Sequence, residues 1–140
     1  MKKATQQPYY ALSEPQYALF HRLGYADAWE GPWSRSDYTR EIREFLGSEW
    51  APPRSSRILA TGCGDGKTTS FLAQKGYQVK GIDIAPTAIQ IARERTRQHD
   101  LEVEHAVGDV TCLEKPDGEF DCVIDTRVHH MLKEDRHRVA

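Results

Sequence analysis

The residues most able to do chemistry are a run of glycines and three separate aspartates. The segment 61–66 reads Thr-Gly-Cys-Gly-Asp-Gly, and Asp83, Asp109 and Asp125 follow it along the chain. Glycines let a backbone turn tightly and let a ligand come close to it. A carboxylate accepts hydrogen bonds from the hydroxyl and amino groups of a bound molecule. Together these residues predict a binding site for a polar small molecule.

The pattern around these residues predicts an α/β fold in which strands alternate with helices. Strands are predicted over 57–60, 77–83, 102–107 and 120–125. Helices are predicted near 68–75, over 86–98 and from near Leu132. Such alternation gives a parallel sheet with right-handed crossovers, whose ligands bind beyond the carboxyl ends of the strands. The glycine run and the three aspartates all fall at those ends.

The chain before residue 54 has a different character and contains all three tryptophans. A helix within 36–50 is predicted, with Ser34 or Ser36 as its cap and Pro52-Pro53 as its end. Its apolar face comprises Tyr38, Ile42, Phe45, Leu46 and Trp50.

We predict residues 1–35 as a cap or lid segment and residues 36–140 as one domain. Two interpretations stay open for the aromatic residues before this helix, a lid over a ligand or packing of the helix on the sheet. They are Tyr25, Trp29, Trp33 and Tyr38.

Composition excludes several classes of protein. The 140 residues include 19 Lys and Arg against 21 Asp and Glu, a net charge of −2, so nothing favours a nucleic-acid or anionic-membrane partner. No apolar run approaches the roughly 18 residues of a spanning helix, and the first residues lack the apolar core of a signal peptide. We therefore expect a cytoplasmic protein.

The three cysteines, Cys63, Cys112 and Cys122, include no Cys-x-x-Cys pair, which predicts reduced thiols and no metal site.

Three interpretations of the glycine run were compared. A nicotinamide dinucleotide site requires its third glycine at the position that Lys67 occupies, so that match fails. A P-loop shares the Gly66-Lys67-Thr68 ending, with Asp125 as a possible magnesium ligand. The P-loop pattern, however, requires a glycine at position 61, where this chain has Thr61. A P-loop would also leave Asp83 and Asp109 without a role.

An S-adenosylmethionine site is the interpretation that uses all the strand ends. Asp83 ends the second strand, where a carboxylate can accept two hydrogen bonds from a ribose diol. Ile84 can lie on the adenine face, and Asp109 can accept a hydrogen bond from the adenine amino group. We therefore prefer this interpretation of the sequence.

Four segments in order carry a resemblance to class I S-adenosylmethionine-dependent methyltransferases. Segments 58–66, 81–89, 108–110 and 117–125 resemble the glycine, ribose, adenine and fourth-strand motifs of that family. Segment 126–132, which contains the His129-His130 pair, resembles the small-molecule branch. The resemblance covers roughly residues 54–138 and implies a Rossmann-like, mostly parallel sheet with helices on its faces. It implies S-adenosyl-L-methionine as cofactor and a small-molecule methyl acceptor as partner.

The resemblance also implies which residues form the site. The cofactor-binding residues it implies are Thr61, Gly62, Cys63, Gly64, Gly66, Asp83, Ile84, Asp109 and Val110. Asp125, His129 and His130 lie where the family lines the methyl-transfer pocket. A general base is needed only if the acceptor loses a proton, and an adjacent His pair is also compatible with one packed and one solvated ring.

Two departures from the family pattern stand out. Ala60 occupies the position where the family has an acidic residue that helps hold the methionine end of the cofactor. Asp65 with a water molecule could substitute for this missing acid. Four predicted strands are also fewer than the seven of the family sheet, so we expect a portion of a longer methyltransferase. An exposed edge at the fourth strand would then favour self-association. A non-catalytic or degenerate S-adenosylmethionine-binding domain is the alternative function.

Overall fold

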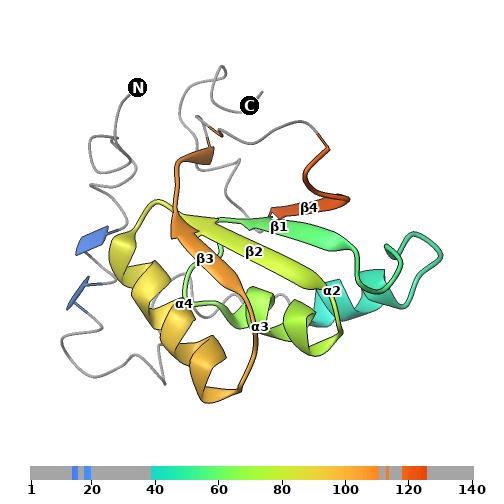
Figure 1. Cartoon of the computed structure of the whole chain (residues 1–140), viewed down its shortest axis with the longest axis horizontal. Helices are drawn as coiled ribbons and strands as arrows, with labels where there is room; N and C mark the ends of the chain where they lie inside the picture. The colour runs from blue at the N-terminus through green and yellow to red at the C-terminus, as the bar shows by residue number, and fades with distance from the viewer. Residues whose placement is uncertain (1–13, 16–17, 20–38, 111–112, 114–117, 126–140) are drawn as a thin grey trace.

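The described residues form a parallel sheet with helices on one of its faces (Figure 1). The computed structural model describes residues 14–15, 18–19, 39–110, 113 and 118–125. The strands are β1 (Arg57–Thr61), β2 (Gln78–Asp83), β3 (Glu104–Val107) and β4 (Cys122–Asp125). The helices are α2 (Thr39–Leu46), α3 (Lys67–Gln74) and α4 (Pro86–Gln98). The strand order β3-β2-β1-β4 confirms the predicted α/β fold.

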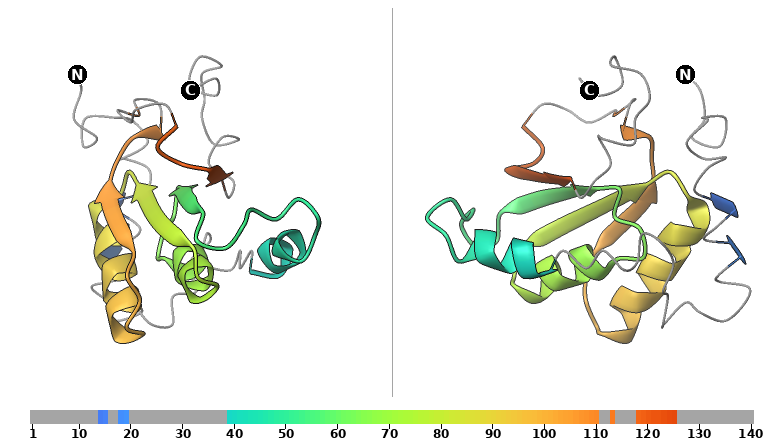
Figure 2. Two further views of the ribbon diagram at one scale, coloured as in Figure 1. Left: turned by 45° about the vertical axis from the view of Figure 1, so that its right-hand side comes forward. Right: turned by 180° about the vertical axis from the view of Figure 1, so that it is seen from behind.

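The carboxyl ends of the strands lie together at one edge of the sheet. Thr61, the last residue of β1, pairs with Ile82 on one side and with Asp125 on the other. Asp83, the last residue of β2, pairs with Val107 at the end of β3. All pairings are parallel, so the loops that follow these strands leave from the same edge (Figures 1 and 2).

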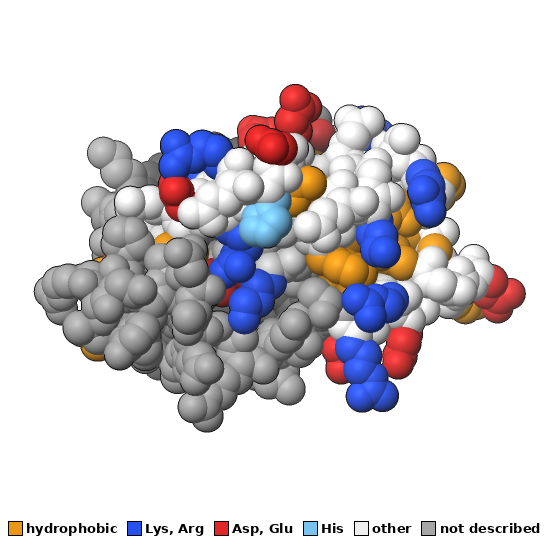
Figure 3. Space-filling model, turned by 90° about the horizontal axis from the view of Figure 1, so that it is seen from below, with side chains coloured by type: hydrophobic (Ala, Val, Ile, Leu, Met, Phe, Trp, Pro, Cys, Tyr) orange, Lys and Arg blue, Asp and Glu red, His pale blue; other side chains and the backbone are white. Residues whose placement is uncertain are grey.

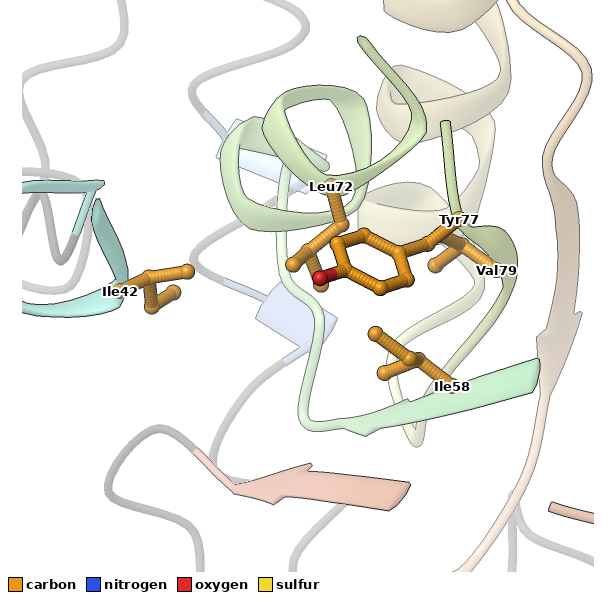
Figure 4. Close-up of a cluster of buried hydrophobic side chains, with 5 residues drawn as sticks. All are labelled: Ile42, Ile58, Leu72, Tyr77 and Val79. Carbon is orange, nitrogen blue, oxygen red and sulfur yellow. The ribbon is translucent and has the colours of Figure 1, made fainter. Parts of the chain in front are cut away.

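The main hydrophobic core lies between α3 and the sheet. Leu72 of α3 points at Ile58, Tyr77 and Val79, while Ile42 approaches from α2 (Figure 4). Ile58 and Leu72 are completely buried, and burial of each such side chain stabilises the fold by about 1.5–3 kcal/mol. The Tyr77 hydroxyl donates to the carbonyl of Pro52 at 2.9 Å, which ties the loop after α2 to this core. Leu72→Ala would therefore leave a cavity between α3 and the sheet and destabilise the fold by about 2–5 kcal/mol.

Close packing of α3 on α4 depends on Gly66, the residue before α3. Its φ of 86° is in the left-handed region, and an added Cβ would lie 2.9 Å from the Cβ of Ala92 on α4. Glycine therefore both makes the turn and lets the two helices approach. Pro86 occupies the first turn of α4, where its missing N–H is not needed, as the sequence predicted.

The helix predicted within 36–50 ends earlier than expected, at Leu46. The Ser48 hydroxyl donates to the carbonyl of Phe45 at 2.6 Å and accepts from the N–H of Trp50 at 3.2 Å, which replaces a further helical turn. Trp50 is 77% exposed and Phe45 is exposed as well, so the assignment of these two residues to the apolar face was wrong, whereas Ile42 is buried as predicted. The predicted caps Ser34 and Ser36 lie outside the described residues, as do Tyr25, Trp29, Trp33 and Tyr38.

The surface over the helices carries basic side chains beside a hydrophobic area (Figure 3). Arg43 of α2 and Lys75 after α3 both stand over the ring of Phe71, at 5.6 and 5.3 Å from its centroid. None of the helices in the described ranges is long and apolar enough to cross a membrane. The cytoplasmic location stays a prediction.

β4 is the outermost described strand beside β1, and Val123 in it is 60% exposed. Self-association through the β4 edge stays a prediction.

Candidate functional site

Asp83 is the centre of the candidate site. One carboxylate oxygen accepts a hydrogen bond from the N–H of Gly64 in the glycine turn, at 3.0 Å. The other oxygen accepts from the N–H of Ala85 at the start of α4, also at 3.0 Å. A carboxylate offers about four acceptor positions. These backbone bonds therefore fix the orientation of the group and leave acceptor positions for ligand hydroxyl groups.

The environment of Asp83 also favours a ligand that donates hydrogen bonds. The residue is only 9% exposed, and burial raises the pKa of its carboxyl above the ordinary value. Bonds from the backbone of Ala85, Gly64 and Ile84 lower this pKa, and the negative charge of Glu14 raises it. Because burial has the largest effect, the charged carboxylate is incompletely compensated by the protein. Two hydroxyl donors of a ribose would supply the missing compensation.

The glycine turn is held in place by its own backbone amides. The N–H of Cys63 donates to the carbonyl of Ile82 at 3.0 Å, and that of Gly66 donates to the carbonyl of Cys63 at 3.1 Å. The N–H of Lys67 donates to the Asp65 carboxylate at 3.4 Å, and that of Gly64 donates to Asp83. A P-loop binds phosphate with such amides, so their engagement within the chain disfavours that interpretation.

The glycines of the turn adopt backbone conformations that other residues avoid. Gly62 and Gly64 have φ values of 64° and 54°, which place both in the left-handed region. Cys63 between them is buried, and burial raises the pKa of its thiol well above the ordinary value. The thiol is therefore protonated at neutral pH and packs with Ala60 and Ile89 as a small hydrophobic group. Cys122 is also a free cysteine, and Cys112 lies outside the described residues.

The ends of β2 and β3 bring the predicted adenine residues beside Asp83. The N–H of Gly108 donates to the backbone carbonyl of Asp83 at 3.0 Å, so the chain leaves β3 directly next to it. Asp109 follows and is buried, while Ile84 and Val110 are half-buried. This arrangement fits the predicted contacts with a nucleoside, since carboxylates and apolar side chains meet at one strand edge.

Ala60 and Asp65 are the two residues that the sequence connects with the methionine end of the cofactor. Ala60 is buried in the apolar cluster with Cys63 and Ile89, and it offers no polar group there. The carboxylate of Asp65 pairs with Arg95 of α4 at 3.4 Å, and the backbone carbonyl of Asp65 accepts from the same side chain at 3.0 Å. Asp65 therefore holds the glycine turn against α4.

The fourth strand contributes less to the described site. Asp125 ends β4 beside Thr61 and is half-buried. The Thr61 hydroxyl donates to the carbonyl of Ile124 at 3.5 Å, which links β1 to β4 at this edge. His129 and His130 lie outside the described residues, so the catalytic roles assigned to them stay predictions.

Two contributions to the site were not predicted from the sequence. The Glu14 carboxylate accepts from the N–H of Thr87 in the first turn of α4, at 3.1 Å from each oxygen. His105 of β3 contacts Thr69 of α3 behind the glycine turn, at 2.9 Å between ring nitrogen and hydroxyl. In the sequence, only the alternation of exposed Glu104 with His105 in β3 indicates that His105 faces the interior, and no local pattern indicates the Glu14 contact.

Comparison with known proteins identifies the family of the chain. A sequence model of the family described as Methyltransferase domain matches residues 58–140. The 2-heptyl-1-hydroxyquinolin-4(1H)-one methyltransferase of Mycobacteroides abscessus is 36% identical over 76 residues, which cover 54% of this chain and 34% of that protein. The 2-methyl-6-phytyl-1,4-hydroquinone methyltransferase of Synechocystis sp. is 35% identical over 91 residues, which cover 64% of this chain and 28% of that protein.

Solved structures share the fold. One described as "Conversion of a Disulfide Bond into a Thioacetal Group during Echinomycin Biosynthesis" has a TM-score of 0.73 and 27% identity, covering 89% of this chain and 51% of that one. The chain spans about a third of the length of the curated relatives it matches. The matched segment contains the glycine turn and all three strand-end aspartates, and it is more than half of the sequence. The chain therefore belongs to the Methyltransferase domain family, which confirms the resemblance to class I S-adenosylmethionine-dependent methyltransferases.

Proposed function

We propose that this chain binds S-adenosyl-L-methionine and serves its transfer of a methyl group to a small-molecule acceptor. The observation that carries the proposal is the buried Asp83 carboxylate, oriented by the amides of Gly64 and Ala85 at the end of β2. A ribose diol is the ligand group that best complements a carboxylate so placed. The family to which the chain belongs uses this chemistry.

The proposal assigns each part of the strand edge a binding role. Asp83 would hold the ribose, Asp109 would accept from the adenine amino group, and Ile84 and Val110 would contact the adenine ring. The glycine turn, from Thr61 through Gly62, Cys63 and Gly64 to Gly66, would pass beside the methionine end.

When bound, the cofactor supplies an electrophilic methyl group on a sulfonium. The protein's contribution is then mainly to hold donor and acceptor in line. Asp125, His129 and His130 would face the acceptor, with a proton-accepting role only if the acceptor is protonated.

The N-terminal segment 1–35 would form a cap over this site, and residues 36–140 the domain below it. The contact of Glu14 with Thr87 supports this part of the proposal, because it fixes one point of the segment two residues beyond Ala85. That point is next to the proposed ribose site. A cap anchored there would exclude water from the cofactor, which strengthens the electrostatic contacts beneath it.

The acceptor class is suggested by the relatives. The matched proteins from M. abscessus and Synechocystis are named for a hydroxyquinolinone and a hydroquinone. We therefore propose hydroxylated ring compounds as the first acceptors to test, using cofactor with a labelled methyl group. Mass spectrometry of the products would then show methyl addition to an acceptor. The absence of any cofactor binding would contradict the proposal.

A non-catalytic S-adenosylmethionine-binding domain is the alternative, and Ala60 favours it. The family acid at this position is replaced by a methyl group packed against Cys63 and Ile89. Cofactor binding without turnover on any acceptor of the panel would select this alternative. The same experiment therefore distinguishes the two functions.

A further inference from the structure

A buried polar network lies directly behind the glycine turn. Nε2 of His105 on β3 is 2.9 Å from the hydroxyl of Thr69 on α3. The same hydroxyl donates to the carbonyl of Gly66 at 3.1 Å. His105 is 4% exposed and Thr69 is completely buried, so no water competes for these bonds. The network therefore joins three elements at the residue that ends the proposed cofactor turn.

The space for this network exists because residue 81 is a glycine. A Cβ added to Gly81 would lie 2.9 Å from the His105 ring, 2.9 Å from the Thr69 methyl group and 3.0 Å from the Cys63 sulfur. Three side chains from three elements thus converge on one position of β2, two residues before Asp83. Such convergence holds the ring of His105 in one orientation.

Counting hydrogens assigns the direction of the bonds. A threonine hydroxyl has one hydrogen, and here it goes to the Gly66 carbonyl. The Thr69 oxygen must then accept from Nε2–H of His105. The other ring nitrogen, Nδ1, is buried and has no hydrogen-bond partner among the described residues. A hydrogen on Nδ1 would leave a buried donor unsatisfied, which costs more than a bare lone pair.

The charge state of the ring agrees with this assignment. Burial, and then the positive charge of Arg93, lower the pKa of His105 to about 4. The ring is therefore neutral at physiological pH. The Arg93 guanidinium also donates to the backbone carbonyl of His105 at 2.7 Å, so α4 fixes the strand at the same residue.

We infer that His105 is a positioning residue for the cofactor turn: its Nε2–H donates to Thr69, and Thr69 donates to the Gly66 carbonyl. This relay sets the orientation of the last peptide of the turn before α3 begins. It acts on the proposed cofactor site from behind, without touching a ligand. The inference rests on the proposed function, because the turn matters only if it binds the cofactor.

The first test is ¹⁵N NMR of the histidine rings in the chain without any ligand. The expected spectrum shows His105 with a protonated Nε2 and a bare Nδ1 at neutral pH. The Nδ1–H tautomer or a charged ring would overturn the inference. This test is independent of cofactor binding.

The second test is the affinity of variants for S-adenosylhomocysteine, measured by calorimetry. Gln at position 105 can place an amide N–H where Nε2–H lies, whereas Leu cannot. We expect His105→Leu to weaken binding about fivefold or more, and His105→Gln to stay within about twofold of the wild type. The exposed His99, directly after α4, provides the matched control, and His99→Leu should leave the affinity unchanged.

A second pair of variants covers the case in which His105→Leu does not fold. Thr69→Ser keeps the hydroxyl and should keep the affinity, while the isosteric Thr69→Val should lower it as His105→Leu does. If the wild type binds and the folded Thr69→Val binds equally well, the inference is wrong and the proposed function stands. If the wild type does not bind, the proposed function fails and the positioning role fails with it.

Discussion

Both carboxylate oxygens of Glu14 lie 3.1 Å from the backbone nitrogen of Thr87, 73 residues further along the chain. The Thr87 hydroxyl donates to the same carboxylate. Thr87 is in the first turn of α4, where unpaired N–H groups and the helix dipole favour a negative charge. The contact therefore joins the N-terminal segment to the edge of the sheet beside Asp83.

Glu14→Gln tests this contact. Loss of the charge at the helix N-terminus should lower the free energy of unfolding by about 1 kcal/mol, measured by urea denaturation. Because the Glu14 charge raises the pKa of Asp83, the variant should also lower that pKa, measured by ¹³C NMR of the Asp83 carboxyl. Glu102→Gln, at an exposed loop position before β3, should change neither quantity. Equal values for the wild type and Glu14→Gln would show that the contact does not form in solution.

His105 should make stability depend on pH. Its pKa is lowered from 6.5 to about 4 in the folded chain, so only the unfolded chain binds this proton between those values. Stability is therefore fully present above pH 6.5 and falls as the pH decreases toward 4. At about 1.4 kcal/mol per pKa unit, the loss approaches about 3 kcal/mol. Unfolding measured across this range should show a shallower slope in His105→Gln, and an identical slope in both proteins would contradict the buried, neutral ring.

Gly81→Ala should destabilise the fold although the substitution adds one methyl group. That methyl would overlap the His105 ring and the Thr69 side chain, both at 2.9 Å. We expect a loss of about 1–3 kcal/mol in the free energy of unfolding. Gly47→Ala is the matched control, since its added Cβ would have only ordinary contacts, the nearest at 3.5 Å. Equal stabilities of the two variants would mean that Gly81 does not make room for the network.

Sequence patterns predicted those features, such as helix starts and turns, that residues close together in the chain determine. Pro86 marks the start of α4, and the glycine spacing marks the turn before α3. Trp50 was misassigned, because helical spacing continues past Gly47 while the Ser48 side chain bonds end the helix. Glu14 and His105 act through partners distant in the sequence. Their roles follow from the packing of elements, and no period or motif could indicate them.

The central claim is that Asp83 and the glycine turn bind S-adenosylmethionine. The most direct measurement is calorimetric titration of the wild type, Asp83→Ala and Asp121→Ala with S-adenosylhomocysteine, with and without magnesium ATP. Asp121 precedes β4 at the opposite edge of the sheet, where it pairs with Arg57 at 3.2 Å, and it serves as the control. We predict binding by the wild type, an unchanged affinity for Asp121→Ala, at least about a tenfold loss for Asp83→Ala, and no competition from the nucleotide. Unchanged affinity in a folded Asp83→Ala, or displacement by magnesium ATP, would contradict the claim.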